Sequence, residues 1–187
     1  MTTDQSGTST DVGPDAVRLA LPAEAREIAA VQRRSWTSAD DVATAALLDE
    51  IDLEAMVQAW HRAITHPPEA RFRVLVAVAG GRVVGLATTM PSQDPDADPA
   101  GDGAIEELVV DPAARRRGHG SRLVNASVDT LRADGFGRVR HWLRTDDDER
   151  RAFLTASGWA PDGAHREIGA EDASVRLKQI RLHTSIG

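Results

Sequence analysis

Apolar residues in the first third of the chain change from a strand-like to a helix-like spacing. VRLAL at 17–21 predicts a short strand, and Pro22 follows at a place where the first turn of a helix tolerates proline. Glu24 is then well placed for the positive end of the helix dipole. One apolar helix face is predicted from Ala25, Ile28, Ala29 and Trp36.

A second helix is predicted after the polar residues Ser38, Ala39 and Asp40, which can cap it. HPPEA, which begins at His66, ends this helix because consecutive prolines cannot continue it. Its apolar face is made of Leu53, Met56, Val57, Trp60 and Ile64.

The middle of the chain has the pattern of a β-hairpin. Residues 72–79 and 82–90 are two β-rich runs, and Gly80-Gly81 between them suits a two-residue turn. Both faces of the first run are apolar, so we expect this pair in the centre of a sheet. The prolines, glycines and aspartates of 91–103 predict a loop, and AIEELVV at 104–110 predicts the next strand.

The remaining elements alternate between helix and strand. A helix from Gly120 onward is predicted to end at Gly135, a strand to span 137–144 and a helix to span 146–157. Trp159 opens a last hairpin that closes through 174–183. This order is typical of an α/β, or α+β layered, domain. We expect one domain over 16–187 and a disordered polar tail over 1–15.

Composition excludes several classes of chemistry. The chain of 187 residues has no cysteine, which excludes disulfides, thiolate metal sites and cysteine nucleophiles and fits a reducing cytoplasm. A net charge of −7 argues against broad nucleic-acid binding. No long apolar run or signal-peptide pattern is present, so we expect no membrane partner. The histidines lack metal-ligand spacing, so we expect no metal.

ARRRGHGSRL, at 114–123, concentrates positive charge beside two glycines. It lacks the glycine and lysine spacing of a nucleotide-binding P-loop. A solvated basic loop and a phosphate site are both consistent with it. The phosphate site is favoured by a strand, a glycine turn and a helix start converging there, where free N–H groups and the helix dipole attract anions.

Arg115-x-x-Gly118-x-Gly120, after LVVDP and before an amphipathic helix, resembles the acetyl-CoA signature of the GNAT family of N-acetyltransferases. VRLALPAEAREIAAVQRRSW is similar to the family's first strand and helix, and RAFLTASGWAPDG to its fourth helix and sixth strand. The resemblance covers about residues 16–183. It implies a mixed, mostly antiparallel central sheet flanked by helices, with splayed fourth and fifth strands.

The same resemblance implies acetyl-CoA as cosubstrate. Pantetheine would lie along the bulged fourth strand, at Leu108, Val109 and Val110, bonded like an added strand. Pyrophosphate would bind main-chain N–H groups from Arg115 through Gly120, and Ser121 can add a hydroxyl. Within that stretch, His119 is either solvent-facing or near phosphate. The remaining residues assigned to the loop are Arg116, Arg117, Gly118 and Gly120.

In this family a substrate amine attacks the thioester directly, so the ammonium group must lose a proton. Glu106 and Glu107 are the candidate bases. Adjacent strand residues point to opposite faces, so one of the two should reach the substrate. The base position of the histone-type branch is occupied here by Ala104, and a water chain is the alternative.

Two family positions differ in this chain. Leu154 stands where many members have the tyrosine that protonates the thiolate, and the chain contains no tyrosine. The thiolate then leaves unassisted or takes a proton from water, or Ser157 or His141 substitutes. Asp147 stands for an asparagine that contacts the cofactor amide, and a carboxylate can only accept there.

The resemblance implies an acetyl-CoA-dependent N-acetyltransferase acting on a primary amine of a small molecule or peptide. Acidic residues at 94–102 and 146–149 would favour a cationic acceptor. The alternative is a catalytically weak GNAT-like module that binds acyl-CoA and regulates or scaffolds. A homodimer is plausible by family analogy.

Overall fold

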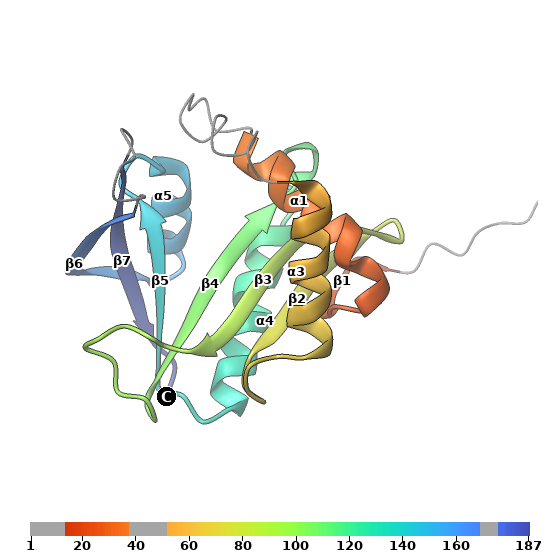
Figure 1. The fold of residues 1–187 in the computed structure, drawn as a ribbon. Coiled ribbons are helices and arrows are strands. Elements are labelled where there is room, and N and C mark those ends of the chain that lie inside the picture. Colours follow the sequence, from red (N-terminus) through yellow and green to blue (C-terminus); the bar gives the residue numbers. More distant parts are fainter. Residues whose placement is uncertain (1–13, 38–51, 169–175) are drawn as a thin grey trace, which may run out of the picture.

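A computed structural model describes residues 14–37, 52–168 and 176–187, which form a twisted sheet covered by helices on both faces (Figure 1). The strands follow the order β1-β2-β3-β4-β5-β7-β6. Every neighbouring pair is antiparallel except β4 and β5. The strands are β1 (Ala16–Leu19), β2 (Arg73–Ala79), β3 (Arg82–Pro91), β4 (Asp102–Val110), β5 (Arg138–Arg144), β6 (Ala160–Ile168) and β7 (Leu177–Ser185).

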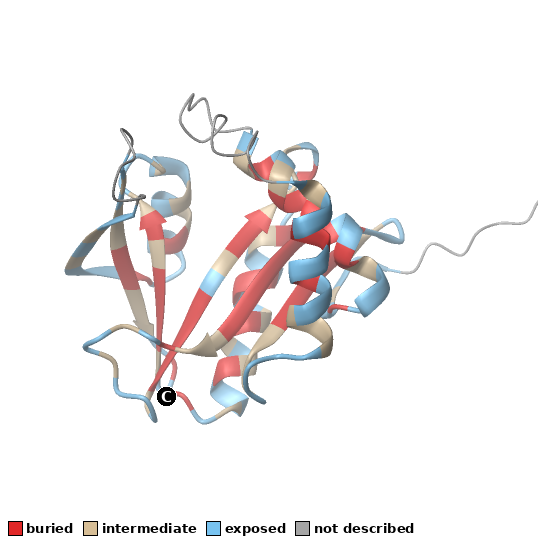
Figure 2. Cartoon of the chain, in the orientation of Figure 1, coloured by how far each residue is buried: buried red, intermediate tan, exposed pale blue. Residues whose placement is uncertain are grey.

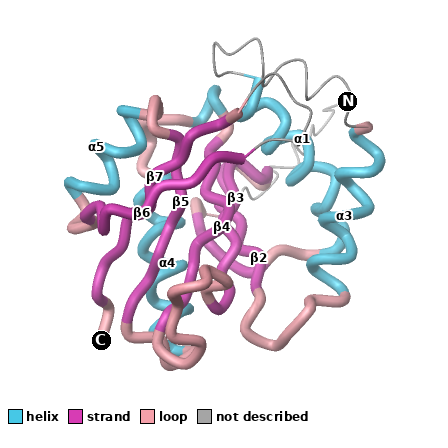
Figure 3. Tube along the Cα trace, turned by 60° about the vertical axis from the view of Figure 1, so that its left-hand side comes forward, coloured by secondary structure: helices cyan, strands magenta, loops and turns pink. Residues whose placement is uncertain are grey.

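Two apolar cores form because alternate strand residues point to opposite faces of the sheet. In β2, Leu75 and Ala77 join the core beneath α4 (His119–Ala133) and α5 (Asp148–Ala156). Val74 and Val76 join the core beneath α1 (Ala25–Thr37) and α3 (Leu53–Thr65). Figure 2 shows that the buried residues follow the central strands and the sheet-facing sides of the helices. Figure 3 shows β6 and β7 at the edge of the sheet far from α3.

The glycine turns lie where the sequence predicts them. Gly80 and Gly81 both have positive φ, of 59° and 73°, and join β2 to β3 in the expected hairpin. Gly135 has a φ of 89° and follows the end of α4. Pro22 begins a short 3-10 helix, η1 (Pro22–Glu24), that leads into α1. The predicted order and type of elements are therefore confirmed.

Some predicted boundaries are wrong by a few residues. The cap proposed at Ser38–Asp40 lies outside the described residues, and Asp52 caps α3 by accepting hydrogen bonds from the N–H groups of Glu54 and Ala55. β3 and β4 extend into the predicted loop, since β3 ends at Pro91 and β4 begins at Asp102.

None of the described helices is long and apolar enough to cross a bilayer.

The two parallel strands are paired only at one end. Pairing of β4 with β5 begins at Asp102 with Arg138 and stops at Ala104 with Arg140. Beyond this point the carbonyl oxygen of Ile105 lies 2.6 Å from Nδ1 of His141, a fully buried side chain on β5. The strands then diverge, as Figure 1 shows, so the splayed fourth and fifth strands expected from the sequence are confirmed.

Charged residues hold the paired end together. Arg138 binds both carboxylate oxygens of Asp102, at 2.6 and 2.7 Å. Arg140 also reaches Asp102, at 2.9 Å, and it donates to Asp96 of the loop before β4. Arg181 of β7 binds Asp96 and Asp94 in the same loop. The loop is thus fastened to β5 and β7 beside the point where the strands separate.

Candidate active site

A β-bulge in β4 places Glu106 and Glu107 on the same face of the sheet. In the pairing with β3, Ile105 lies opposite Thr89 and Leu108 lies opposite Ala87. The two residues of β4 between these pairs therefore lie opposite a single residue of β3. Ile105 and Leu108, three positions apart, both pack in the core beneath α4. The two glutamates between them therefore face α1, and the expectation that they point to opposite faces is wrong.

Glu107 has an unusually ordered environment for a carboxylate. Its Oε1 accepts a hydrogen bond of 3.0 Å from Nε2 of Gln32 on α1, and its backbone N–H donates to Oγ1 of Thr88 at 3.0 Å. Burial raises the pKa of Glu107 to about 7, while the Gln32 bond and the charge of Arg150 oppose that rise. A carboxylate with this pKa can exchange a proton near neutral pH.

Glu106 lies next to Glu107 but is held less firmly. It is more exposed, and among the described residues no hydrogen bond to its carboxylate is found. Desolvation raises its pKa, the positive charge of Arg166 on β6 lowers it, and Asp94 raises it. Glu106 is therefore the more exposed of the two carboxylates, and neither of them is among the residues that line the pocket between α4 and α5.

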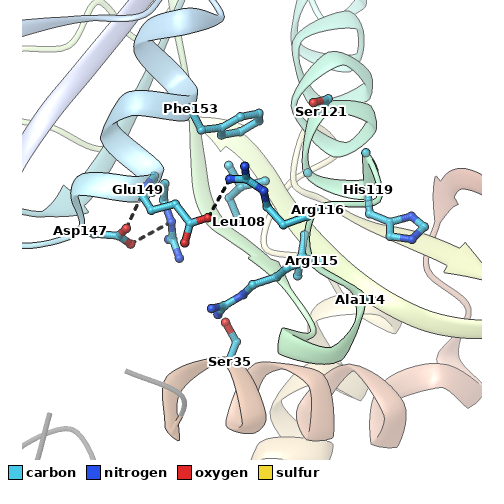
Figure 4. A pocket seen from close by; sticks show the side chains of 14 residues that line it. Ser35, Leu108, Ala114, Arg115, Arg116, His119, Ser121, Asp147, Glu149 and Phe153 are labelled. Carbon is cyan, nitrogen blue, oxygen red and sulfur yellow. Dashed lines mark hydrogen bonds and ion pairs between the residues drawn. The ribbon is translucent and has the colours of Figure 1, made fainter. Parts of the chain in front are cut away.

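A pocket of about 360 Å³ opens along the splayed strands. It lies between the start of α4 and the start of α5, and Figure 4 shows its walls. Beyond Ala104, the β5-facing backbone edge of β4 has no strand partner among the residues that the structure describes. The pocket is lined by Ser35, Leu108, Val110, Ala114, Arg115, Arg116, Gly118, His119, Gly120, Ser121, Asp147, Glu149, Arg150 and Phe153.

The loop before α4 has the geometry of an anion site. Gly118 precedes the helix with a φ of 82°, and a Cβ at this position would meet nothing within 4 Å. The first main-chain hydrogen bond of α4 runs from the N–H of Arg122 to the carbonyl oxygen of Gly118. The N–H groups of the residues just before Arg122 therefore have no acceptor within the helix. These groups and the helix dipole point to the pocket, where an anion would be stabilised.

The predicted loop residues differ in how they face the pocket. Arg115 points toward Ser35 of α1, whereas Arg116 reaches across to Glu149 of α5 at 3.2 Å (Figure 4). Arg117 is exposed and is not part of the lining. Ser121 lines the pocket from the first turn of α4.

His119 is buried, with only 3% of its surface exposed, so the prediction that it faces solvent is wrong. Its Nδ1 lies 3.3 Å from Nη1 of Arg122, one helical turn further along. It still borders the pocket, which fits the alternative position near phosphate. Val109 also differs from its predicted neighbours, because its side chain packs against α1 while Leu108 and Val110 line the pocket.

α5 supplies the opposite wall. Asp147 caps the helix by accepting from the Arg150 N–H at 2.9 Å, and its other oxygen pairs with the Arg150 side chain. Leu154 is fully buried in the core beneath the sheet. Ser157 donates its hydroxyl to the carbonyl of Phe153, so it closes the helix end.

His141 closes the inner end of the gap. Burial lowers its pKa to about 4, so the ring is neutral at physiological pH. Because Ile105 O can only accept, Nδ1 carries the proton and donates it. Nε2 is left as a buried acceptor without a partner among the described residues. A neutral ring with this tautomer does not supply a proton from Nε2.

Several residues that line the pocket or contact Glu107 were not predicted from the sequence. Glu149, Arg150 and Phe153 share a face of α5 by their helical spacing. Gln32 and Ser35 are polar residues on the buried face of α1 and lie one turn apart. Buried polar residues within an apolar helix face are the signal that could have identified these last two.

The acidic segments carry less free charge than the sequence suggests. Asp94, Asp96 and Asp102 are bound by arginines of β5 and β7. The acids that follow β5 are also paired, Asp148 with Arg151 and Glu149 with Arg116. A strongly negative rim is therefore not found among the described residues.

A family model matches this arrangement over most of its elements. The model described as the acetyltransferase (GNAT) family matches residues 28–159, which is more than half of the chain. The chain belongs to the GNAT family. The matched range includes α1 from Ile28 onward, the bulged strand β4, the loop before α4 and the whole of α5.

Curated relatives of this GNAT protein match it over part of their length. A mycothiol acetyltransferase of Kineococcus radiotolerans is 39% identical over 108 residues, which are 58% of this chain and 33% of that protein. A mycothiol acetyltransferase of Beutenbergia cavernae is 37% identical over 70 residues, which are 37% of this chain and 24% of that protein. The matches thus span a third or less of these relatives.

Solved structures share the fold over nearly the whole chain. An N-acetyltransferase from Staphylococcus aureus has a TM-score of 0.72 at 13% identity, over 94% of this chain and 100% of that chain. An acetyltransferase from Salmonella typhimurium, solved with acetyl-CoA, has a TM-score of 0.70 at 15% identity, over 94% and 95%. At these identities the likeness is one of fold.

Proposed function

We propose that this GNAT protein transfers an acetyl group from acetyl-CoA to a primary amine of a small molecule or peptide. The observation that carries the proposal is Glu107, a carboxylate with a pKa raised to about 7, held on the bulge immediately before the pocket-lining Leu108. Family membership supplies the reaction class, and this side chain supplies a base with a suitable pKa.

The residues of the pocket fit acetyl-CoA. The open space beside Gly118 and the first N–H groups of α4 suit a diphosphate, with Arg115 and Arg116 adding positive charge. The unpaired edge of β4 suits an extended chain carrying amides. Asp147 is engaged as the cap of α5, so its contribution to such a ligand is limited to an acceptor oxygen.

When bound, acetyl-CoA supplies the thioester whose C–S bond breaks as the amine forms the new C–N bond. Glu107 takes the proton that the ammonium group must lose, because a raised pKa makes its carboxylate a stronger base. Glu106, the more exposed of the two glutamates, orients the incoming amine through its charge. With Leu154 buried and Ser157 bonded to its own helix, water protonates the departing thiolate.

We propose to search for the acceptor among several classes of amine. A cationic acceptor would interact with Glu106 and Glu107, because the aspartates of the neighbouring loop are neutralised by arginines. The acceptor panel should contain polyamines, aminoglycosides, peptide amines and the amine substrate of the mycothiol acetyltransferases. We also propose that this protein is cytoplasmic. Its oligomeric state can be measured in the same preparation.

The test is release of CoA thiol with this panel, using wild type, Glu107→Gln and Glu106→Gln. We expect Glu107→Gln to lower kcat by about 100-fold or more, since general-base catalysis contributes about 10²–10⁴-fold. Glu106→Gln should act mainly on KM. For the wild type, kcat/KM should fall below about pH 7, as Glu107 becomes protonated.

Two outcomes would contradict the proposal. Full turnover by Glu107→Gln would exclude this residue as the base and favour a water chain. Acetyl-CoA binding, measured by calorimetry, without turnover on any amine would favour a regulatory or scaffolding module that binds acyl-CoA.

A further inference from the structure

A chain of hydrogen-bonded polar groups runs from α3 through α1 to the bulge of β4. Nε1 of Trp60 donates to Oε1 of Gln32 at 2.8 Å, and Nε2 of Gln32 donates to Oε1 of Glu107 at 3.0 Å. Trp60 and Gln32 are 9% and 6% exposed. The three residues are far apart in the sequence, and each belongs to a different element.

The indole group fixes which way the Gln32 amide is turned. An indole N–H can donate but cannot accept, so the Gln32 atom that faces Trp60 must be the carbonyl oxygen. The NH₂ group of the same amide then necessarily faces Glu107. Without Trp60, the amide could turn over and present its oxygen to the carboxylate, which would be repulsive.

The Gln32 amide binds one oxygen of Glu107 and stabilises one of its two protonation states. A donor at Oε1 stabilises the carboxylate form and opposes the effect of burial, which favours the protonated form. It also orients the carboxyl group, leaving Oε2 without a bond to Gln32. The neighbouring charges act in opposite directions, with Arg150 of α5 lowering the pKa of Glu107 and Glu106 of β4 raising it.

We propose that Gln32 is a positioning residue, which Trp60 locks in the donor orientation so that Glu107 offers an oriented, ionisable oxygen to the acceptor amine. This inference rests on the proposed function for its consequence in turnover. Its structural part, the coupling of Trp60 and Gln32 to the ionisation of Glu107, can be measured without any turnover.

The experiment is an NMR titration of the side-chain carboxyl carbon of Glu107, assigned by its loss in Glu107→Gln. It is made on wild type, Gln32→Met and Trp60→Phe. Gln32→Met keeps the length of the side chain and removes the donor, so the pKa of Glu107 should rise by about one unit. Trp60→Phe keeps an aromatic ring and removes the N–H, so the shift should have the same sign and be smaller.

Val57→Ala is the matched control, because it loosens the same buried face of α3 without touching the polar chain. It should lower the thermal midpoint and leave the titration of Glu107 unchanged. Trp60→Phe keeps the inference testable if Gln32→Met fails to fold. An unchanged titration in both variants would overturn it, and so would an equal shift in Val57→Ala.

Turnover gives the second readout. In Gln32→Met the acidic limb of kcat/KM should move to higher pH by the same amount as the titration, with kcat lowered about tenfold at neutral pH. If the titration shifts but Glu107→Gln remains fully active, the coupling holds and the proposed base is wrong. If the titration does not shift and Glu107→Gln is inactive, the base holds and the role of Gln32 is wrong.

Discussion

The two ends of the β4–β5 junction use opposite chemistry. At the paired end, Asp102 is bound by Arg138 and Arg140, and every carboxylate of this cluster has a cationic partner. At the open end, Glu107 is partly buried beside a neutral donor, and Nε2 of His141 has no partner within the described part of the chain. The molecule thus pairs its charges where the two strands are joined and leaves polar groups incompletely satisfied where the strands separate.

This difference shows how a gap in a sheet can be kept rigid. Two adjacent strands tend to pair along their whole length, so separation requires something that ends the pairing. Here the bulge at Glu106 and Glu107 shifts β4, and His141 takes over the carbonyl that β5 would otherwise bind. The arginine and aspartate cluster then fixes the strands on the other side of that point.

The largest effect should come from the paired end. Asp102→Ala should destabilise the fold by about 3 kcal/mol, because it removes the buried carboxylate that Arg138 and Arg140 share and leaves Arg140 only Asp96 and Asp94. Urea denaturation measures this loss. Asp129→Ala removes an exposed ion pair with Arg132 and should cost under about 1 kcal/mol. Equal losses in the two variants would show that charge does not hold the paired end.

His141→Leu should destabilise the fold by about 2–3 kcal/mol, because the buried carbonyl of Ile105 loses its donor. His141→Gln, which keeps an N–H donor, should lose less. The penalty should shrink in acid. In the folded protein His141 stays neutral, whereas in the unfolded chain it takes up a proton as pH falls from 6.5 to about 4. Through this group wild type loses stability over that range, and His141→Leu does not. A penalty that is constant over this range would contradict the neutral ring.

The smallest effect separates the two glycines of the loop. Gly118→Ala should cost about 1 kcal/mol, since its φ of 82° disfavours a side chain. Gly120→Ala should leave stability unchanged or slightly raised, because its Cβ would make ordinary contact with Phe153 at 3.8 Å within a helix. Both should weaken acetyl-CoA binding in calorimetry. Unchanged affinity in both would place the diphosphate elsewhere.

Local signals were sufficient to predict the elements and the loop before α4. Gly80-Gly81 and Gly135 form turns whose conformation depends on the glycines themselves, so these turns can be predicted from the sequence. The contacts that define the candidate base and the paired end of the strands are not local. Gln32 and Glu107 are 75 residues apart, and Arg181 and Asp96 are 85 residues apart. Alternation also failed at Glu106 and Glu107, because it assumes an unbroken strand and the bulge breaks it.

The bulge also determines which kinds of sequence change the site can tolerate. Exchange of one side chain on β4 alters a single contact. Deletion of either Glu106 or Glu107 would remove the bulge and leave Ile105 and Leu108 two positions apart, where strict alternation keeps both in one core. The remaining glutamate would lie alone opposite Thr88. We therefore expect the shortened variant to keep its core and to lose the pair of glutamates that distinguishes this site.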